Sequence, residues 1–159
     1  MLEFSPREVV EMAVRTEKLG HAYYTEFSEK FKSDKDIHEL FVNLADKEVA
    51  HEVRFGKLRD SIGAETPEGW AEVSQYMRAF VESAFFLGKD RAMAHMQNIR
   101  DPQSAVTMAI MFEKETLLYF YGMRDCVAAG DKAVVDEIIG EEKQHIVQLA
   151  QLKEKYLEK

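Results

Sequence analysis

The sequence predicts an all-α protein: a four-helix bundle with a long, partly helical crossover between helices two and four. Its 159 residues include only three prolines and eight glycines, which leaves few breaks and favours long helices. Hydrophobic residues recur in alternating steps of three and four, the spacing of a helix face that packs against partner helices. The length suits one domain over residues 1–159 with a substantial core.

Composition and charge narrow the class of protein. The formal net charge of −8 argues against nucleic acid as a partner, and no basic run suggests an anionic membrane surface. No apolar stretch approaches the ~20 residues of a membrane span, and the N-terminus has no signal-peptide pattern. We therefore expect a cytoplasmic protein. Cys126 is the only cysteine, which excludes a disulfide framework and a cysteine-based zinc or iron–sulfur site within this chain.

The first two helices have clear start signals. Ser5, Pro6 and Glu8 form a capping box with proline in the first turn, so the first helix should run from there to about residue 31. Asp34 then caps a second helix that should end near residues 62–63.

The remaining elements follow in the same way. A third helix should start at residues 66–68, carry its apolar residues on one side and be interrupted near Gly88. A short amphipathic piece with Met93, Met96 and Ile99 follows. Residues 101–102 cap the fourth helix, which should end at Gly130 as a C′ residue, and the last helix should begin at residue 131.

Polar residues interrupt the apolar faces of the four long helices near their midpoints. Glu48 and His51 lie three residues apart, and so do Glu142 and His145, so each pair shares one helix face. The complete set of such polar residues on the four faces is Glu17, Glu48, His51, Glu113, Glu142 and His145. The four helices thus offer four carboxylates and two imidazoles to one core.

The chain also contains an internal repeat. The segment 13–18 resembles the segment 109–114, and each precedes a helix that bears Glu-x-x-His. Two helix pairs, each with one Glu and one Glu-x-x-His, predict a pseudo-two-fold arrangement. The segment of about 64–101 must then be the crossover between the halves.

A buried polar network, or a wrong assignment of surface positions to the core, would be the simpler explanation for these six residues. Isolated buried carboxylates cost several kcal/mol each unless they are paired. Arg124 is the only cation on these helix faces, and it cannot neutralise four glutamates. Two divalent metal ions can, and carboxylate and imidazole donors suit them.

With this ligand pattern the chain resembles the rubrerythrin-like branch of the ferritin superfamily, the di-iron carboxylate four-helix bundles. The resemblance covers nearly the whole chain and implies a ferritin-like fold with two iron ions; manganese or zinc would fit the same ligands. It implies that one iron is held by Glu17, Glu48 and His51. The other iron would be held by the equivalent residues of the second half, Glu113, Glu142 and His145. Glu48 and Glu142 would be the bridging carboxylates.

The sequence departs from the rubrerythrin pattern in three ways. The cysteine-rich, rubredoxin-like module of full rubrerythrins is absent, so electrons would come from a separate donor such as a rubredoxin. Ile110 stands where rubrerythrins carry an extra glutamate, which bears on their redox-linked ligand exchange. Tyr24 follows Glu17 at the family's seven-residue offset, whereas the repeat counterpart of Tyr24 is Phe120.

Tyr24 has two interpretations. A tyrosine on a core face can simply pack with a satisfied hydroxyl, or it can act beside the metals in electron transfer, and we predict it as a candidate catalytic residue. Glu115 is an alternative to Glu113 but points away from the helix face. His21, His38 and His95 have no glutamate three residues before them, and we expect ordinary core or surface roles for them.

These features lead to one preferred function and two alternatives. The preferred function is a di-iron oxidoreductase that reduces peroxide or O2, with electrons from the external donor. The alternatives are a ferroxidase or iron-handling protein of the ferritin-like type, and a metal-free structural bundle. The resemblance also implies a homodimer that pairs through aromatic residues of the crossover, namely Trp70, Phe80, Phe85 and Phe86.

Overall fold

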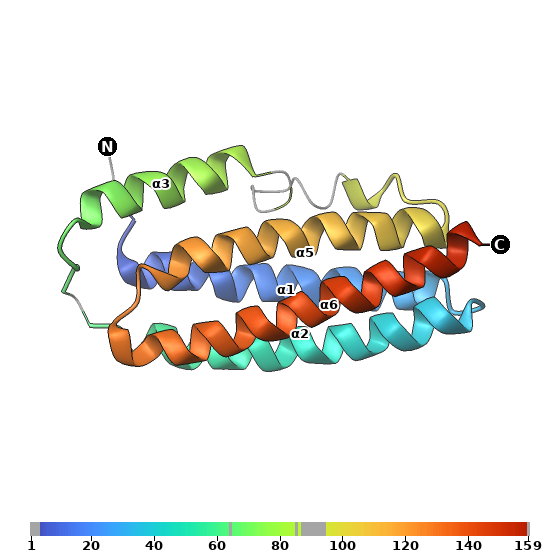
Figure 1. Ribbon diagram of the computed structural model, residues 1–159, viewed down its shortest axis with the longest axis horizontal. Coiled ribbons are helices and arrows are strands. Elements are labelled where there is room, and N and C mark those ends of the chain that lie inside the picture. Colours follow the sequence, from blue (N-terminus) through green and yellow to red (C-terminus); the bar gives the residue numbers. More distant parts are fainter. Residues whose placement is uncertain (1–3, 64, 85, 87–94, 159) are drawn as a thin grey trace.

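Four long helices form an antiparallel bundle, and a shorter helix lies along it (Figure 1). In this computed structural model, residues 4–63, 65–84, 86 and 95–158 are described. The bundle helices are α1 (Pro6–Lys30), α2 (Lys35–Ser61), α5 (Pro102–Arg124) and α6 (Lys132–Leu157), and the shorter helix is α3 (Trp70–Ser83). Within the described residues there is no β-strand, which confirms the all-α prediction.

The crossover connects the two helix pairs over the full length of the bundle (Figure 1). Helices α1 and α2 form one antiparallel pair, and α5 and α6 form the other. Since α2 and α5 both end at the same end of the bundle, the chain must return along its side between them, and α3 lies against α5 on this path. Across the described part of the chain, no helix has both the length and the apolar character of a membrane span.

The predicted N-terminal caps are present. Ser5 accepts a hydrogen bond from the Glu8 amide at 3.2 Å, and the Glu8 carboxylate accepts one from the Ser5 amide at 2.8 Å, which completes the capping box. Asp34 accepts from the amide of Ile37, and Asp101 accepts from the amide of Ser104 at 2.8 Å. These caps fix where α1, α2 and α5 begin.

Two predicted boundaries are wrong. Helix α3 begins at Trp70 rather than at residues 66–68, because Gly69 adopts a left-handed conformation with φ of 75° that a helix cannot continue through. Helix α5 ends at Arg124, six residues before Gly130. Gly130 lies instead in a 3₁₀ turn, Ala129–Asp131, and α6 starts after it. The predicted break near Gly88 and the position of Met93 lie outside the described residues.

The hydrophobic core consists of two clusters, one toward each end of the bundle. One includes Val10, Phe55 and Phe120, together with Trp70 and Met77 from the crossover. The other is built around the aromatic residues of α1 and α2, and its largest members are Tyr23, Tyr24, Phe27 and Phe41. The predicted polar residues lie between the two clusters, so a polar layer divides an otherwise apolar interior.

The aromatic residues of the crossover pack inward. Trp70 is only 6% exposed and donates its indole N–H to the Phe4 carbonyl at 2.7 Å, and Phe86 is 4% exposed. Phe80 is half-buried against the same core, and Phe85 lies outside the described residues. Trp70 and Phe86 therefore serve the protomer's own core and are not free for the dimer contact that we expected of them. The homodimer itself stays a prediction.

Candidate metal centre

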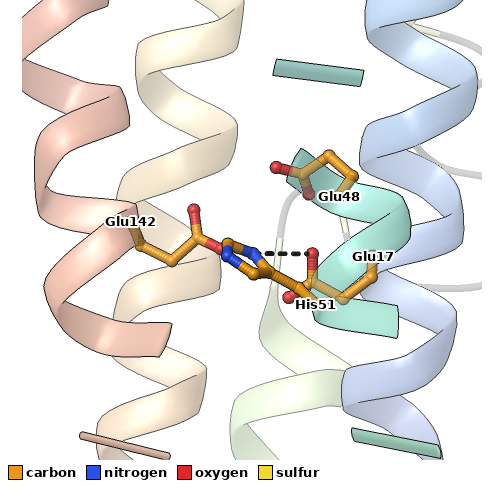
Figure 2. Close-up of side chains that lie close together, drawn as sticks. All are labelled: Glu17, Glu48, His51 and Glu142. Carbon is orange, nitrogen blue, oxygen red and sulfur yellow. Dashed lines mark ion pairs between the residues drawn. The ribbon is translucent and has the colours of Figure 1, made fainter. Parts of the chain in front are cut away.

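The six residues predicted as metal ligands meet in the polar layer at the middle of the bundle. Their ligand atoms form two overlapping groups, and within each group these atoms lie within 4.8 Å of one another. The first group comprises Glu17, Glu48, His51 and Glu142, which Figure 2 shows pointing toward one another from α1, α2 and α6. The second comprises Glu48, Glu113, Glu142 and His145. Each of the four bundle helices contributes, as the internal repeat predicts.

Glu142 lies between the two histidines. One carboxylate oxygen is 2.7 Å from Nδ1 of His51, and the other is 2.8 Å from Nδ1 of His145. The two imidazole rings are stacked, with centroids 5.6 Å apart and planes 17° from parallel. Both histidines thus direct the same ring nitrogen toward a shared carboxylate.

Glu48 is the second residue shared by both groups. Its Oε1 lies 3.5 Å from Nδ1 of His145, and Oε1 of Glu113 is equally distant from that nitrogen. On the other side of the layer, Oε2 of Glu17 is 3.6 Å from Nδ1 of His51. Glu48 and Glu142 therefore occupy the positions that a bridging role requires, with Glu17 and Glu113 at either side.

Burial leaves nine nitrogen and oxygen atoms of these six residues without a hydrogen-bond partner outside the centre, among the residues that the structure describes. Their close polar contacts are with one another, chiefly those of Glu142 with the two histidines. Buried polar groups are nearly always paired with a donor or acceptor, so ligand atoms that meet only one another fit metal ions that complete their coordination. The residues present fit two divalent ions held by oxygen and imidazole ligands.

The carboxyl groups of the centre differ in proton affinity. Burial, followed by repulsion from neighbouring carboxylates, raises the pKa of Glu17 and Glu48 well above the ordinary value. The same causes raise the pKa of Glu113 to about 7. For Glu142, burial alone would raise the pKa, but hydrogen bonding to both histidines lowers it. Without metal, Glu142 is thus the carboxylate that stays ionised.

The two histidines hold their protons strongly. Burial alone would lower the pKa of His51, but Glu142 and Glu141 raise it to about 9. The pKa of His145 rises to about 10 because Glu113 and Glu142 outweigh the same effect of burial. A metal ion bound at Nδ1 must displace these protons, so metal binding at this centre will release protons.

Tyr24 lies against the centre. It is fully buried, and its hydroxyl donates a hydrogen bond to Oε1 of Glu113, although Tyr24 belongs to α1 and Glu113 to α5. Burial, with the charge of Glu113, raises the pKa of Tyr24 well above its ordinary value, so the phenol keeps its proton. The hydroxyl is satisfied by a predicted ligand, which fits either interpretation of Tyr24, and its catalytic role stays a prediction.

The structure adds Glu141 and Arg54, which our sequence reasoning missed. Glu141 Oε2 accepts a hydrogen bond from Nε2 of His51 at 2.9 Å, and Oε1 accepts from Arg54 at 2.6 Å. Burial alone would raise the pKa of Glu141, but these two partners lower it. A carboxylate on the outer nitrogen of a metal-binding histidine fixes its tautomer and orientation. The adjacent acid pair Glu141-Glu142 was the available signal.

The surroundings of His145 are different. A pocket of about 220 Å³ borders this histidine, and Lys47 contributes to its lining. In the internal repeat, Lys47 is the counterpart of Glu141, because each precedes the glutamate of a Glu-x-x-His pair. A lysine cannot accept a hydrogen bond from an imidazole N–H, so the two histidines are supported unequally.

The residues discounted from the sequence lie outside the two groups. His21 and His38 each place Nδ1 within hydrogen-bond distance of a backbone carbonyl, that of Ala45 at 3.2 Å and that of Ser28 at 3.0 Å. Glu115 accepts from the Phe86 amide at 2.7 Å and so holds the crossover. Arg124 pairs with Asp136 of α6, at the end of the bundle helices.

Comparisons with known proteins agree with this fold. The rubrerythrin family model matches residues 8–153. A crystal structure from Thermotoga maritima, whose protein is provisionally described as a ferritin-like diiron-carboxylate protein, aligns with a TM-score of 0.75 and 23% identity. The alignment covers 98% of this chain and 99% of that chain, which shows a shared fold. A comparison with curated proteins gives no match.

The metal-free protein should lose stability as the pH rises from about 5 to about 9. Glu17, Glu48 and Glu113 have raised pKa values, and so do both histidines, so the folded state binds more protons than the unfolded chain in this range. The free energy of unfolding therefore falls with pH. Thermal unfolding with chelator, and again with Mn(II), measures this. A metal-free melting temperature that climbs with pH would contradict the prediction, and the stabilisation by Mn(II) should grow with pH.

Replacement of Glu48 by Gln should abolish stoichiometric metal binding, because both groups share this carboxylate. The metal-free variant should be more stable than the wild type at pH 7, since a buried carboxyl of raised pKa is replaced by a neutral group of the same shape. Metal analysis after anaerobic loading gives the content. Glu52→Gln is the matched control: Glu52 lies one turn further on α2 and pairs with Lys18 at 3.7 Å at the surface. Unchanged metal content in Glu48→Gln would refute the site.

Replacement of Glu141 by Gln should weaken metal binding on the His51 side by about 10- to 100-fold, the usual effect of removing a hydrogen-bond partner of a ligand. Calorimetric titration with Mn(II) or Zn(II) resolves this loss from binding on the His145 side. Glu137→Gln is the control, because Glu137 pairs with Arg54 at 2.9 Å, whereas the carboxylate at Nε2 of His51 is that of Glu141. Equal affinities in Glu141→Gln and Glu137→Gln would show that the His51 contact does not matter.

Proposed function

Since the chain belongs to the rubrerythrin family, we propose that it is a di-iron oxidoreductase that reduces peroxide or O2 with electrons from a separate donor. The observation that supports this most is the set of nine buried ligand atoms in one layer, contributed by all four bundle helices, that have no hydrogen-bond partner outside the centre in the described part of the chain. The Thermotoga maritima protein that shares the fold carries a diiron-carboxylate description.

A pair of ferrous ions would supply the two electrons that reduction of H2O2 to two water molecules requires, with two protons from the surroundings. The protein would supply the geometry. His51 and His145 would anchor one ion each from α2 and α6, while Glu142, which lies within 2.8 Å of both imidazoles, would hold the two positions at a fixed separation. Glu17 and Glu113 would close the layer at either side.

Protons are available beside the centre. Tyr24 keeps its phenolic proton at neutral pH and donates it in a hydrogen bond to Glu113. Glu113 itself has a pKa of about 7 in the metal-free protein. We assign Tyr24 the role of holding a proton at Glu113 and of orienting that carboxylate. Phe120, its counterpart in the repeat, has no hydroxyl and can do neither. A tyrosine hydroxyl therefore supports Glu113 but has no equivalent at Glu17.

The residues of this sequence offer no evident redox group besides the proposed metal ions. Cys126 is the only thiol of this sequence; it is 2% exposed, and burial raises its pKa to about 12. Such a thiol is a poor thiolate ligand and a poor redox group at neutral pH. A small iron protein of the rubredoxin type fits the need for one-electron transfer, and we propose it as the donor class.

Stopped-flow mixing of the anaerobic Fe(II)-loaded protein with H2O2 tests the proposal. The ferric absorbance should develop within seconds and much faster than for Glu48→Gln mixed with the same Fe(II). Tyr24→Phe should retain its iron and oxidise it more slowly, because Glu113 loses its hydrogen-bond donor. If O2 oxidises the iron rapidly and ultracentrifugation finds a large closed shell, iron handling replaces peroxide reduction. Oxidation no faster than in Glu48→Gln would refute both.

A further inference from the structure

Gly20 lies directly against the Glu48 side chain. It is a buried residue of α1, one turn after Glu17. A Cβ atom built at Gly20 would lie 2.4 Å from Oε2 of Glu48, 3.0 Å from its Cδ and 3.2 Å from its Cγ. Real Cβ atoms essentially never approach a heavy atom within 3.0 Å, so any side chain at this position would force Glu48 to move.

The other glycines of the bundle have different surroundings. Each bundle helix contains one glycine, although glycine is the poorest helix former after proline. Those of α2 and α6, Gly56 and Gly140, have no atom within 4 Å of a hypothetical Cβ, and that of α5, Gly122, faces side chains of α3. Gly20 is thus the bundle glycine whose missing side chain leaves room for a predicted metal ligand.

Glu48 depends on this room more than a surface residue would. Its side chain is 1% exposed, and its polar neighbours are the Glu17 carboxyl and Nδ1 of His145 at 3.5 Å, both within the centre. No described residue outside the centre holds the carboxylate, so its position depends on the shape of the surrounding side chains and on the ions it would bind. Because Glu48 is shared by both ligand groups, a displacement of this one carboxylate affects both metal positions.

We propose that Gly20 is a positioning residue of the centre: the absence of a side chain there gives Glu48 the space to reach both metal positions. The inference rests on the proposed metal function and adds to it. Comparison of the two halves of the internal repeat shows that only the first half has a glycine at this position. Gly20 follows Glu17 by three residues, and the residue that follows Glu113 by three is Thr116, which is fully buried. The second half of the bundle has a larger residue at the equivalent position.

The test compares Gly20→Ala with two matched controls, Gly56→Ala and Gly140→Ala, in the full chain. All three changes favour the helix, so the controls should raise the melting temperature of the metal-free protein and leave metal binding unchanged. Gly20→Ala should lower Co(II) affinity by about 10- to 100-fold and change the visible spectrum of bound Co(II). If Gly20→Ala binds two Co(II) ions with wild-type affinity and spectrum, the inference is overturned.

A double variant covers the case in which Gly20→Ala does not fold. When Glu48→Ala is added, the carboxylate that meets the new Cβ is gone, so cooperative unfolding and helix content should return. If the double variant also fails to fold, the role of Gly20 lies in helix packing, and the inference is wrong. A wild-type protein that binds no Co(II) would instead refute the proposed function. Even then, the dependence of the Gly20→Ala effect on Glu48 could be measured from the unfolding of the metal-free single and double variants.

Discussion

The concentration of four carboxylates in one buried layer is the constraint on which the rest of this structure depends. Glu17, Glu48, Glu113 and Glu142 are each at most 1% exposed, and the ion pairs recorded for them within the described residues are with His51 and His145. Two divalent cations carry the charge that would balance four carboxylates. The layer also lies between the two clusters of the hydrophobic core, so apolar packing on both sides of it aligns the four helices.

The sequence predicted the four bundle helices and all six residues of the layer, because both follow from local spacing and from the internal repeat. It did not predict where α5 ends, since Gly130 carries the usual signal of a helix end but lies in a 3₁₀ turn. It also missed the roles of Glu141, Arg54 and Gly20. Their parts depend on contacts between helices far apart in the chain, which no spacing within one helix reveals.

The two halves of the internal repeat have the same predicted metal ligands, but the residues that surround these ligands differ. Glu141 supports His51, whereas its counterpart Lys47 lines a pocket beside His145. Tyr24 donates to Glu113, whereas its counterpart Phe120 has no polar group to offer Glu17. Two metal ions bound to such equivalent ligands would differ in affinity, because the neighbours of a ligand tune its basicity and orientation.

The six residues of the layer are between 0% and 3% exposed, and this burial restricts what can meet the centre. Molecules of a few atoms, such as dioxygen or hydrogen peroxide, can pass between side chains that fluctuate slightly, whereas an organic substrate would require the helices to separate. A redox protein docked on the surface would remain outside this layer. Electrons passed to metal ions held there would cross at least one layer of side chains, so the helices would limit both the size of the molecules that enter and the rate of electron transfer.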